Sequence, residues 1–285
     1  MVDKKCLIVI DSNSVIHRAF HALPPLTTKK GEIVGAVYGF LLVFLKAIKE
    51  FQPDFVVACF DVKGPTFRHE KYKEYKAKRA KAPQSLYDQI PIVKEVLEAF
   101  GVPIFEKQGF EADDIIGTIA KLSPIETIIV SGDSDNFQLV DAKTKVYALR
   151  KGVKDTVLYD EALVTEKYQG LKPKQLVDYR ALRGDPTDNI SGVSGIGEKT
   201  GMDLIKEYGT LENIYDNIAL ITAKIREKLA QQKEKAFFSR ELSEIYKDVP
   251  LEFNLEACRW SNYDKAKVTQ SLQSLGFLSL IPRLP

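Results

Sequence analysis

Short apolar runs alternate with helical patterns over the first half of the chain. The runs LIVID (7–11), DFVVACFD (54–61) and TIIVSGD (127–133) are mostly β-branched or aromatic, which is typical of buried strands. Helical patterns lie around and between them, at residues 34–50, 84–100 and 112–121. Strands that alternate with helices favour a mostly parallel sheet with helices on both faces.

The strand signals stop at about residue 171. The patterns at 173–182, 198–208, 211–217 and 222–247 indicate helices joined by glycine-rich turns. No period of 20–50 residues repeats along the chain. We therefore expect an α/β domain at residues 1–165 and an all-helical domain at residues 166–285.

The composition indicates a cytoplasmic protein without a membrane contact. The 285 residues are 45% hydrophobic, enough for a core, and 28% charged. The longest apolar runs, at 6–10 and 40–45, are too short to span a bilayer or to serve as a signal peptide. Three scattered cysteines (Cys6, Cys59 and Cys258) form no CxxC pair, which favours a reducing cytosol and argues against a disulfide framework or a zinc site.

Four aspartates stand where a predicted strand ends, namely Asp11, Asp61, Asp133 and Asp135. Because the carboxyl ends of parallel strands share one edge of a sheet, where ligands bind, we expect these side chains to meet. A single aspartate in such a place is usually a turn former or a helix cap. Placement after three successive strands is harder to explain by capping alone.

Glu111, Asp113 and Asp114 open the helix predicted at 112–121 and add three carboxylates to the same edge. A helix dipole favours such groups by roughly 0.3–1 kcal/mol. Two like charges at about 4 Å repel by roughly 1 kcal/mol in water and about 4 kcal/mol in a half-dry site. Bound cations or raised pKa values are therefore needed, and so many carboxylates suggest two divalent ions such as Mg²⁺ or Mn²⁺.

Residues 63–81 carry eight Lys or Arg and two Glu, with aromatic residues between them. Such a run is most often a solvated helix face. Because this run follows Asp61 directly, we expect it to rise over the acidic edge as a basic helical arch (about 63–82) that attracts phosphates. Tyr75 would stack on unpaired bases, and Lys76 and Arg79 would share one helix face.

The sequence GVSGIGEKT (192–200) joins two predicted helices. Glycines let the backbone approach a ligand closely, and a helix N-terminus directs N–H groups at an anion. The pattern indicates a helix–hairpin–helix element within 184–201 that grips a DNA backbone; an ordinary turn between helices is the alternative. Asp185 and Asp188 lead into the loop and could reach the acidic edge. The residues expected to bind DNA are Gly192, Val193, Gly195, Ile196, Gly197, Lys199 and Thr200.

Together these segments resemble the 5′-nuclease (5′→3′ exonuclease and flap endonuclease) domain at the front of bacterial DNA polymerase I. The similarity runs along the whole chain and rests on LIVIDSNSVIHRAFHALPPL, VACFDVKGPTFRHEKYKEYKAKR, GFEADDIIGTIA, SGDSDNFQLV and GDPTDNISGVSGIGEKT. It implies a PIN-like (resolvase-like) α/β fold followed by an all-helical domain with a helix–hairpin–helix (H3TH) element.

The resemblance also implies roles for single residues. Lys76, Arg79 and Arg18 would contact the substrate phosphate, and the loop at 192–197 would bind K⁺. His17 would stack near the cleaved bond, although the family usually has Tyr or Phe there, and Ser134 replaces a common lysine, so rate and substrate preference are left open. The implied metal ligands are Asp11, Asp61, Glu111, Asp113, Asp133, Asp135 and Asp188, with Asp114 and Asp185 supporting the site.

The resemblance implies a metal-dependent 5′→3′ exonuclease and structure-specific flap endonuclease acting on DNA with 5′ flaps, nicks or 5′ ends, RNA primer–DNA included, in replication and repair. We expect a monomer that works with a fused or separate DNA polymerase. The alternatives are a PIN-type ribonuclease, which would be shorter and lack the 192–200 loop, and a catalytically inactive structure-specific DNA-binding module, which would be expected to have lost acids. A haloacid-dehalogenase-like phosphatase would need DxD where residues 11–13 read DSN.

Overall fold

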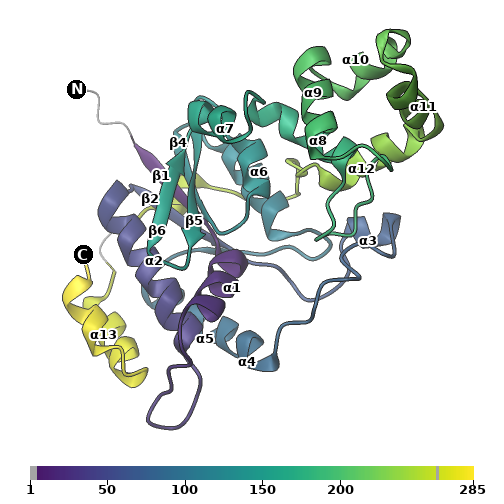
Figure 1. Cartoon of the computed structure of the whole chain (residues 1–285). Helices are drawn as coiled ribbons and strands as arrows, with labels where there is room; N and C mark the ends of the chain where they lie inside the picture. Colours follow the sequence, from purple (N-terminus) through teal and green to yellow (C-terminus); the bar gives the residue numbers. More distant parts are fainter. Residues whose placement is uncertain (1–4, 261–262) are drawn as a thin grey trace.

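The computed structural model describes residues 5–260 and 263–285, and its centre is a six-stranded sheet (Figure 1). The strand order is β3-β2-β1-β4-β5-β6, with parallel pairs from β3 to β5 and an antiparallel pair at β6. The predicted mostly parallel sheet is confirmed. The strands are β1 (Cys6–Asp11), β2 (Phe55–Cys59), β3 (Ile104–Phe105), β4 (Glu126–Ser131), β5 (Thr144–Lys151) and β6 (Asp155–Tyr159).

Helices cover both faces of the sheet because its central strands are apolar on both sides. Ile8 and Ile10 of β1 belong to the core under α1, α2 and α5, whereas Leu7 and Val9 belong to the core under α6. The helices of this layer are α1 (Ser12–Ala22), α2 (Gly35–Phe51), α3 (Phe67–Lys71), α4 (Gln84–Tyr87), α5 (Gln89–Ala99), α6 (Ala112–Leu122) and the 3-10 helix η1 (Asp135–Leu139).

Helices alone follow the sheet, as the sequence predicts. The single helix expected at 222–247 is instead two helices, α11 and α12, separated at Gln232. These elements are α7 (Glu161–Lys167), η2 (Pro173–Gln175), α8 (Leu176–Arg183), α9 (Glu198–Tyr208), α10 (Leu211–Asp216), η3 (Ile218–Leu220), α11 (Ala223–Gln231) and α12 (Lys233–Ser243).

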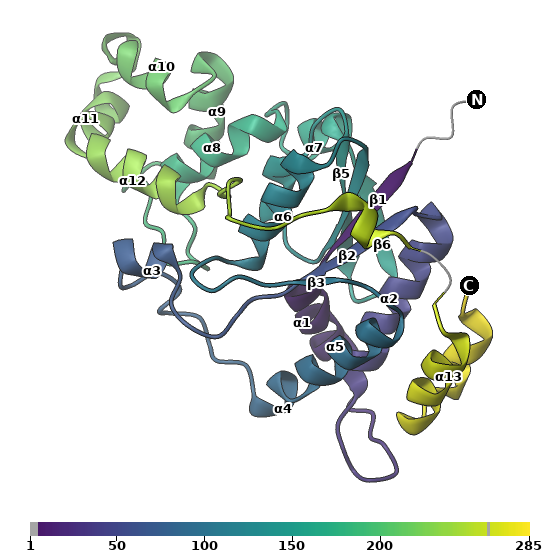
Figure 2. The ribbon, with the colours of Figure 1, turned by 180° about the vertical axis from the view of Figure 1, so that it is seen from behind.

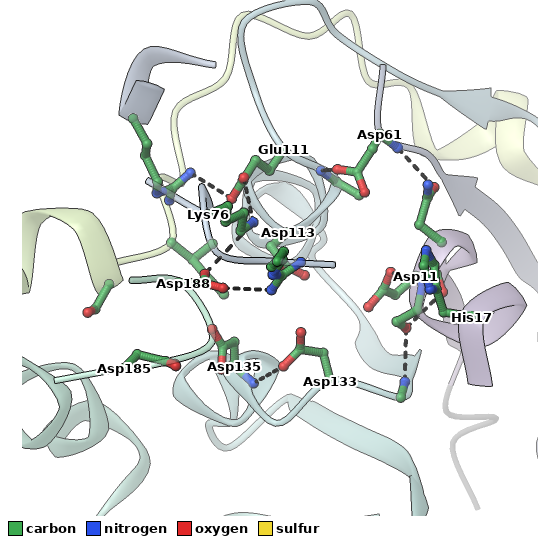
Figure 3. A pocket seen from close by; sticks show the side chains of 18 of the residues that line it. Asp11, His17, Asp61, Lys76, Glu111, Asp113, Asp133, Asp135, Asp185 and Asp188 are labelled. Atoms are coloured by element: carbon green, nitrogen blue, oxygen red, sulfur yellow. Dashed lines mark hydrogen bonds and ion pairs between the residues drawn. The ribbon is translucent and has the colours of Figure 1, made fainter. Parts of the chain in front are cut away.

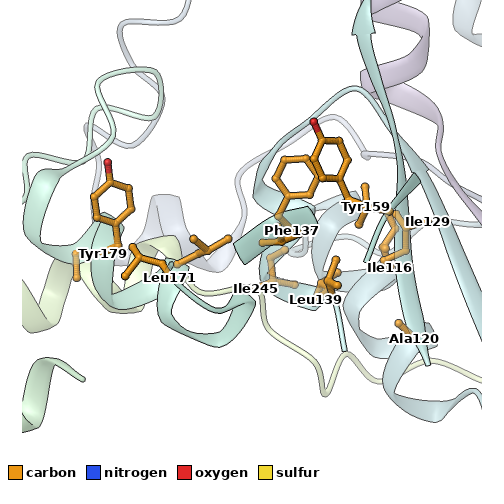
Figure 4. Close-up of a cluster of buried hydrophobic side chains, with 14 of the residues drawn as sticks. Ile116, Ala120, Ile129, Phe137, Leu139, Tyr159, Leu171, Tyr179 and Ile245 are labelled. Carbon is orange, nitrogen blue, oxygen red and sulfur yellow. The ribbon is translucent and has the colours of Figure 1, made fainter. Parts of the chain in front are cut away.

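One hydrophobic cluster continues from the sheet into the helical part, so the two parts share a core. Figure 4 shows Ile116 and Ile129 at the sheet end of this cluster and Leu171 and Tyr179 at the helical end, with Phe137 between them. The shared core fixes the helical part against the edge of the sheet at which β1, β2 and β4 end.

The last segment returns to the α/β layer. The Trp260 N–H donates to the Asp54 carbonyl (2.7 Å), and α13 (Lys265–Ser274) buries Val268 and Leu272 completely in the core that holds α5. Figure 2 shows α13 at the far side of the sheet from α9 and α10. The segment also contains η4 (Leu255–Cys258) and η5 (Leu278–Arg283). Among the described residues no helix is long and apolar enough to cross a membrane.

Candidate active site

A pocket of about 390 Å³ gathers acidic side chains at the carboxyl ends of three strands. Asp11 ends β1, Asp61 follows β2, and Asp133 follows β4. Figure 3 shows these groups with side chains from the start of α6 and from the turn after α8. Eight of the nine acids expected at the metal site line this pocket: Asp11, Asp61, Glu111, Asp113, Asp133, Asp135, Asp185 and Asp188.

Some of these carboxylates form ion pairs. The Lys76 Nζ lies 2.6 Å from Glu111 Oε1, and the Arg79 Nη2 lies 2.7 Å from Asp188 Oδ1. The buried Arg180 reaches in from α8, and its Nη2 lies 2.5 Å from an oxygen of Asp135. The cations that line the pocket are five (Arg18, Arg68, Lys76, Arg79 and Arg180), too few to balance eight carboxylates.

Four carboxylates at the strand ends and at the start of α6 accept hydrogen bonds from neutral donors alone, as Asp185 does from the Thr187 N–H (2.9 Å). Asp11 accepts from the Ser131 hydroxyl (2.6 Å) and from the backbone N–H of Ser14 (3.2 Å). Asp61 accepts from the N–H of Ala112 (2.8 Å), so it also fixes the first residue of α6. The other two, Asp113 and Asp133, accept from the Asn136 amide (2.9 Å) and the Asp135 N–H (2.9 Å), respectively.

Burial and crowding raise the pKa values of several of these acids. Burial, opposed by bonds from Ser131 and Ser14, raises the pKa of Asp11 to about 6. Burial raises the pKa of Asp135 to about 7 even though Arg180 opposes it. The pKa of Asp113 also lies well above its ordinary value because this acid is buried beside Asp11. For Glu111, burial is outweighed by Lys76 and Arg68, so its pKa falls. When these acids are ionised, the pocket therefore carries more negative than positive charge.

The donor chemistry fits hard divalent ions, which bind carboxylate oxygens. A divalent ion favours the ionised form of each acid whose pKa is raised here. Within residues 5–260 and 263–285, however, no three His, Cys, Asp or Glu side chains already surround a common ion position. Ion binding would therefore require Glu111, Asp135 or Asp188 to exchange a cationic side chain for the ion, or the remaining acids to reorient.

Asp114, expected to support the metal site, is not among the residues that line the pocket. Its side chain is fully buried, and its two oxygens accept from Arg68 Nη1 and Nη2 at 2.8 Å each. The N–H groups of Glu111 and Tyr246 donate to the same carboxylate at 3.1 and 2.8 Å. Arg68, expected as part of the basic arch, is only 3% exposed and ties α3 to α6.

Most of the expected helical arch is not helical. Helix α3 ends at Lys71, and Lys76 has a left-handed φ of +56°. Tyr75 is only 3% exposed, and its hydroxyl lies 3.1 Å from both Glu111 Oε2 and Asp188 Oδ2. In this structure its ring is therefore packed inside the protein and does not present a stacking surface. Arg79, with 45% of its side chain exposed, is the most accessible cation of this segment toward the pocket.

Helix α1 brings His17 and Arg18 to the pocket. The Arg18 Nη2 donates to the Gly132 carbonyl (3.0 Å) in the turn after β4. Burial, with the nearby charges of His21 and Arg79, lowers the pKa of His17, so its ring is neutral at neutral pH. Both predicted residues therefore lie beside the acidic edge.

The loop at 192–200 forms the predicted hairpin between α8 and α9, beyond the pocket. Gly192 has a φ of +59°, and an added Cβ there would meet the Gly184 nitrogen at 2.3 Å, so only glycine fits. The side chains of Val193 and Ile196 are buried in the shared core, whereas Gly195 and Gly197 are exposed. Val193 and Ile196 therefore do not present their side chains to DNA, whereas Gly195 and Gly197 lie at the surface.

Several side chains of this site were not predicted. Ser131, Ser14 and Asn136 hold the acids through hydrogen bonds, and Arg180 neutralises Asp135. Asn136 directly follows the strand-end pair Asp133 and Asp135, and this position next to two predicted site residues is the sequence signal that could have identified it. Arg180 lies on a helix of the second part of the chain, and no local pattern indicates its partner.

A resolvase-like α/β layer with a carboxylate pocket at its strand ends, next to a helix–hairpin–helix element, defines a class of nucleases. Family models agree with this class. Residues 6–169 match the "5'-3' exonuclease, N-terminal resolvase-like domain", and residues 171–266 match the "5'-3' exonuclease, C-terminal SAM fold". The chain belongs to the 5′-3′ exonuclease family.

Similar proteins include DNA polymerase I of Caldicellulosiruptor bescii, which is 43% identical over 283 residues that cover 98% of this chain and 33% of that protein. DNA polymerase I of Bacillus subtilis is 39% identical over 288 residues, with 100% and 33% covered. The chain thus spans about a third of the length of these relatives.

Solved structures with the same fold include the T5 D15 protein co-crystallised with metal ions, with a TM-score of 0.72 at 21% identity, covering 95% of this chain and all of that one. The catalytic core of Rad2 in complex with DNA substrate has a TM-score of 0.63 at 20% identity, with 99% and 94% covered. At these identities the likeness concerns the fold.

Proposed function

We propose that this chain hydrolyses DNA phosphodiesters near 5′ ends, at flaps, nicks and duplex ends, as a divalent-metal nuclease. The observation that supports this most directly is the pairing of opposite charges in one pocket. Eight carboxylates that can hold cations lie beside Lys76 and Arg79, whose charges suit a phosphate.

Asp11, Asp61, Asp113 and Asp133, whose hydrogen bonds come from neutral donors, would hold the ions first, and the other acids of the pocket would follow. Bound divalent ions would lower the pKa of a water molecule and neutralise charge on the phosphate. Arg79 would bind the phosphate oxygens, together with Lys76 and Arg18, and stabilise the charge that develops during cleavage. His17, being neutral, would stack on the substrate beside the cleaved bond.

The hairpin would hold the duplex. The backbone N–H groups of Gly195 and Gly197, the exposed Lys199 and the half-buried Thr200 at the start of α9 would contact phosphates without reading bases. K⁺ would bind to the carbonyls of 192–197. The Gly195 carbonyl already accepts from Lys228 Nζ at 2.9 Å, so K⁺ would compete with that lysine there.

The finer assignments follow from the same site. We propose Mg²⁺ or Mn²⁺ as the ion, RNA primer–DNA junctions as additional substrates, and a DNA polymerase, fused or separate, as the partner in replication and repair. The protein would act as a monomer in the cytoplasm, where its three buried free cysteines stay reduced. The catalytic part would extend to about residue 165 and the DNA-binding part would follow it, with the last segment, which carries α13, packed back on the catalytic part.

The test uses a 5′-flap DNA labelled at either end, with Mg²⁺. Wild type should release products that carry a 5′-phosphate, and Asp113→Ala should abolish cleavage while its flap affinity, measured with Ca²⁺, stays within a few-fold of wild type. Cleavage by Asp113→Ala in Mg²⁺ would contradict the proposal. A matched RNA flap separates the ribonuclease alternative, since preference for RNA would favour it.

A further inference from the structure

Asn136 lies between two carboxylates that are 102 residues apart in sequence. It belongs to η1, directly after the strand-end acids, and is completely buried. Its Nδ2 is 2.9 Å from Asp113 Oδ1 on α6 and 3.5 Å from Asp11 Oδ2 at the end of β1. A neutral donor therefore stands where two buried carboxyl groups from separate elements approach each other.

The Ser131 hydroxyl fixes the direction of these hydrogen bonds. Its Oγ donates to Asp11 Oδ2 (2.6 Å), and it accepts from Asn136 Nδ2 (3.2 Å) and from the Asp133 N–H (2.9 Å). A hydroxyl has one hydrogen and two lone pairs, so all of them are used. The Asn136 amide thus reaches Asp113 directly and Asp11 through Ser131.

The other end of the same amide has no partner. Among the described residues the Asn136 Oδ1 is buried without a hydrogen bond, and an unpaired buried carbonyl destabilises a fold. The reverse orientation of the amide would point this oxygen at two carboxylates. The hydrogen bonds that Asn136 makes with its side chain are therefore those of its Nδ2 group with Ser131 and with the two acids.

We propose that Asn136 is a positioning residue, which holds Asp11 and Asp113 in the arrangement that receives a divalent ion. The inference rests on the proposed metal-dependent nuclease function and deepens it. Loss of a hydrogen-bonded partner of a metal ligand lowers metal affinity by roughly 10–100-fold. Asn136→Leu keeps a similar volume and removes the unpaired oxygen together with the donor to Asp113, two changes that oppose each other in stability, so metal affinity should change much more than stability.

The matched control is Gln138→Leu. Gln138 lies in the same 3-10 helix, is 4% exposed, and uses its amide on backbone groups, the Ile245 N–H (3.0 Å) and the Ser243 carbonyl (3.2 Å). Neither of these hydrogen bonds of Gln138 involves an acid of the pocket. Its loss should lower the thermal midpoint and leave metal affinity unchanged.

The experiment measures Mn²⁺ binding by calorimetry without DNA, thermal unfolding in EDTA, and flap cleavage over a range of Mg²⁺. We expect Asn136→Leu to raise the Kd for Mn²⁺ by roughly 10–100-fold, with a nearly unchanged thermal midpoint. Its cleavage rate should recover toward wild type at saturating Mg²⁺, so the apparent metal constant changes more than kcat.

A wild-type Kd for Mn²⁺ in folded Asn136→Leu would overturn the inference alone, and so would an equal rise in Gln138→Leu. If Asn136→Leu fails to fold, Ser131→Ala removes the hydroxyl that links Asn136 to Asp11, and an unchanged Kd for Mn²⁺ in that variant overturns the inference. A wild-type protein that neither binds Mn²⁺ nor cleaves in Mg²⁺ would instead overturn the proposed function.

Discussion

Asp113 and Asp114 are neighbours with the same charge, yet their surroundings predict opposite effects of the same substitution. Asp114 is fully buried and paired with Arg68, which is 3% exposed. Asp113 is buried beside Asp11, which helps to raise its pKa well above the ordinary value. Replacing each with Asn removes one charge and changes the shape little, so the pair isolates the electrostatic difference.

Asp114→Asn leaves the buried Arg68 guanidinium without its bidentate partner. Breaking a buried ion pair in this way costs about 3–5 kcal/mol. Since Glu111 Oε2 stays 3.3 Å from Arg68 Nη1, part of the charge remains balanced, and we expect the lower end, about 3 kcal/mol. At roughly 2–4 °C per kcal/mol, the thermal midpoint should fall by roughly 6–12 °C.

Asp113→Asn should have the opposite effect on stability. Because burial and Asp11 disfavour its ionised form at neutral pH, removing the charge should leave the free energy of unfolding in EDTA unchanged or higher. The Asn oxygen can still accept from Asn136. Cleavage should nevertheless be lost, because a proposed ligand of the ion is gone.

Urea unfolding in EDTA at pH 7.5, with flap cleavage in Mg²⁺, measures both effects. Asp114→Asn should be less stable, yet its folded fraction should still cleave, whereas Asp113→Asn should be stable and inactive. The reasoning is refuted if Asp113→Asn loses as much stability as Asp114→Asn. It is also refuted if Asp114→Asn is fully stable but inactive, since Asp114 would then act as a ligand.

Three further predictions concern the pocket and the hairpin. Asp11 and Asp135 have raised pKa values of about 6 and about 7, so the folded state binds more protons than the unfolded state, and the free energy of unfolding in EDTA should fall as pH rises from about 4 to about 7. Urea unfolding should show a weaker dependence on pH for Asp135→Asn, and a free energy of unfolding that rises with pH in wild type would contradict this prediction. Lys76→Ala should lower single-turnover cleavage by about 10²-fold, with flap affinity in Ca²⁺ changed far less. Gly192→Ala should lower both the thermal midpoint and duplex binding, whereas Gly197→Ala, whose Cβ would meet nothing within 4 Å, should lower duplex binding only, as fluorescence anisotropy would show.

The sequence predicts the central strands well because they are apolar on both sides. β1, β2 and β4 lie under helices on each face, so their residues form uninterrupted apolar runs. β3 has only two residues, too few for any pattern. β5 and β6 (144–151 and 155–159) carry polar residues among their apolar positions and lie toward the edge of the sheet, so their sequences differ little from loops.

The arch shows why local pattern fails where tertiary contacts take over the backbone. The Lys76 N–H donates to the Asp188 carbonyl (3.0 Å), and Asn189 donates through its amide to the Glu74 carbonyl (2.8 Å). These bonds use backbone groups that a helix over 72–82 would need for itself. Their partners lie more than a hundred residues away, so charge and spacing within 63–81 could not reveal them. The acids were predicted correctly as a converging group because strand ends meet by topology alone.

The cations that neutralise the pocket are also those that the proposed function assigns to the substrate. Lys76 and Arg79 pair with Glu111 and Asp188 in this structure. The same side chain cannot balance a carboxylate and a phosphate fully at once, so an ion that takes over Glu111 and Asp188 makes both cations available to DNA. The metal should therefore bind the protein–DNA complex more tightly than it binds the free protein, and DNA should bind the metal-loaded protein more tightly than it binds the free protein. By linkage the two enhancements must be equal. The crowding of acids would then have a second consequence beyond holding ions: it would keep the side chains proposed to bind phosphate paired with carboxylates until the ions arrive.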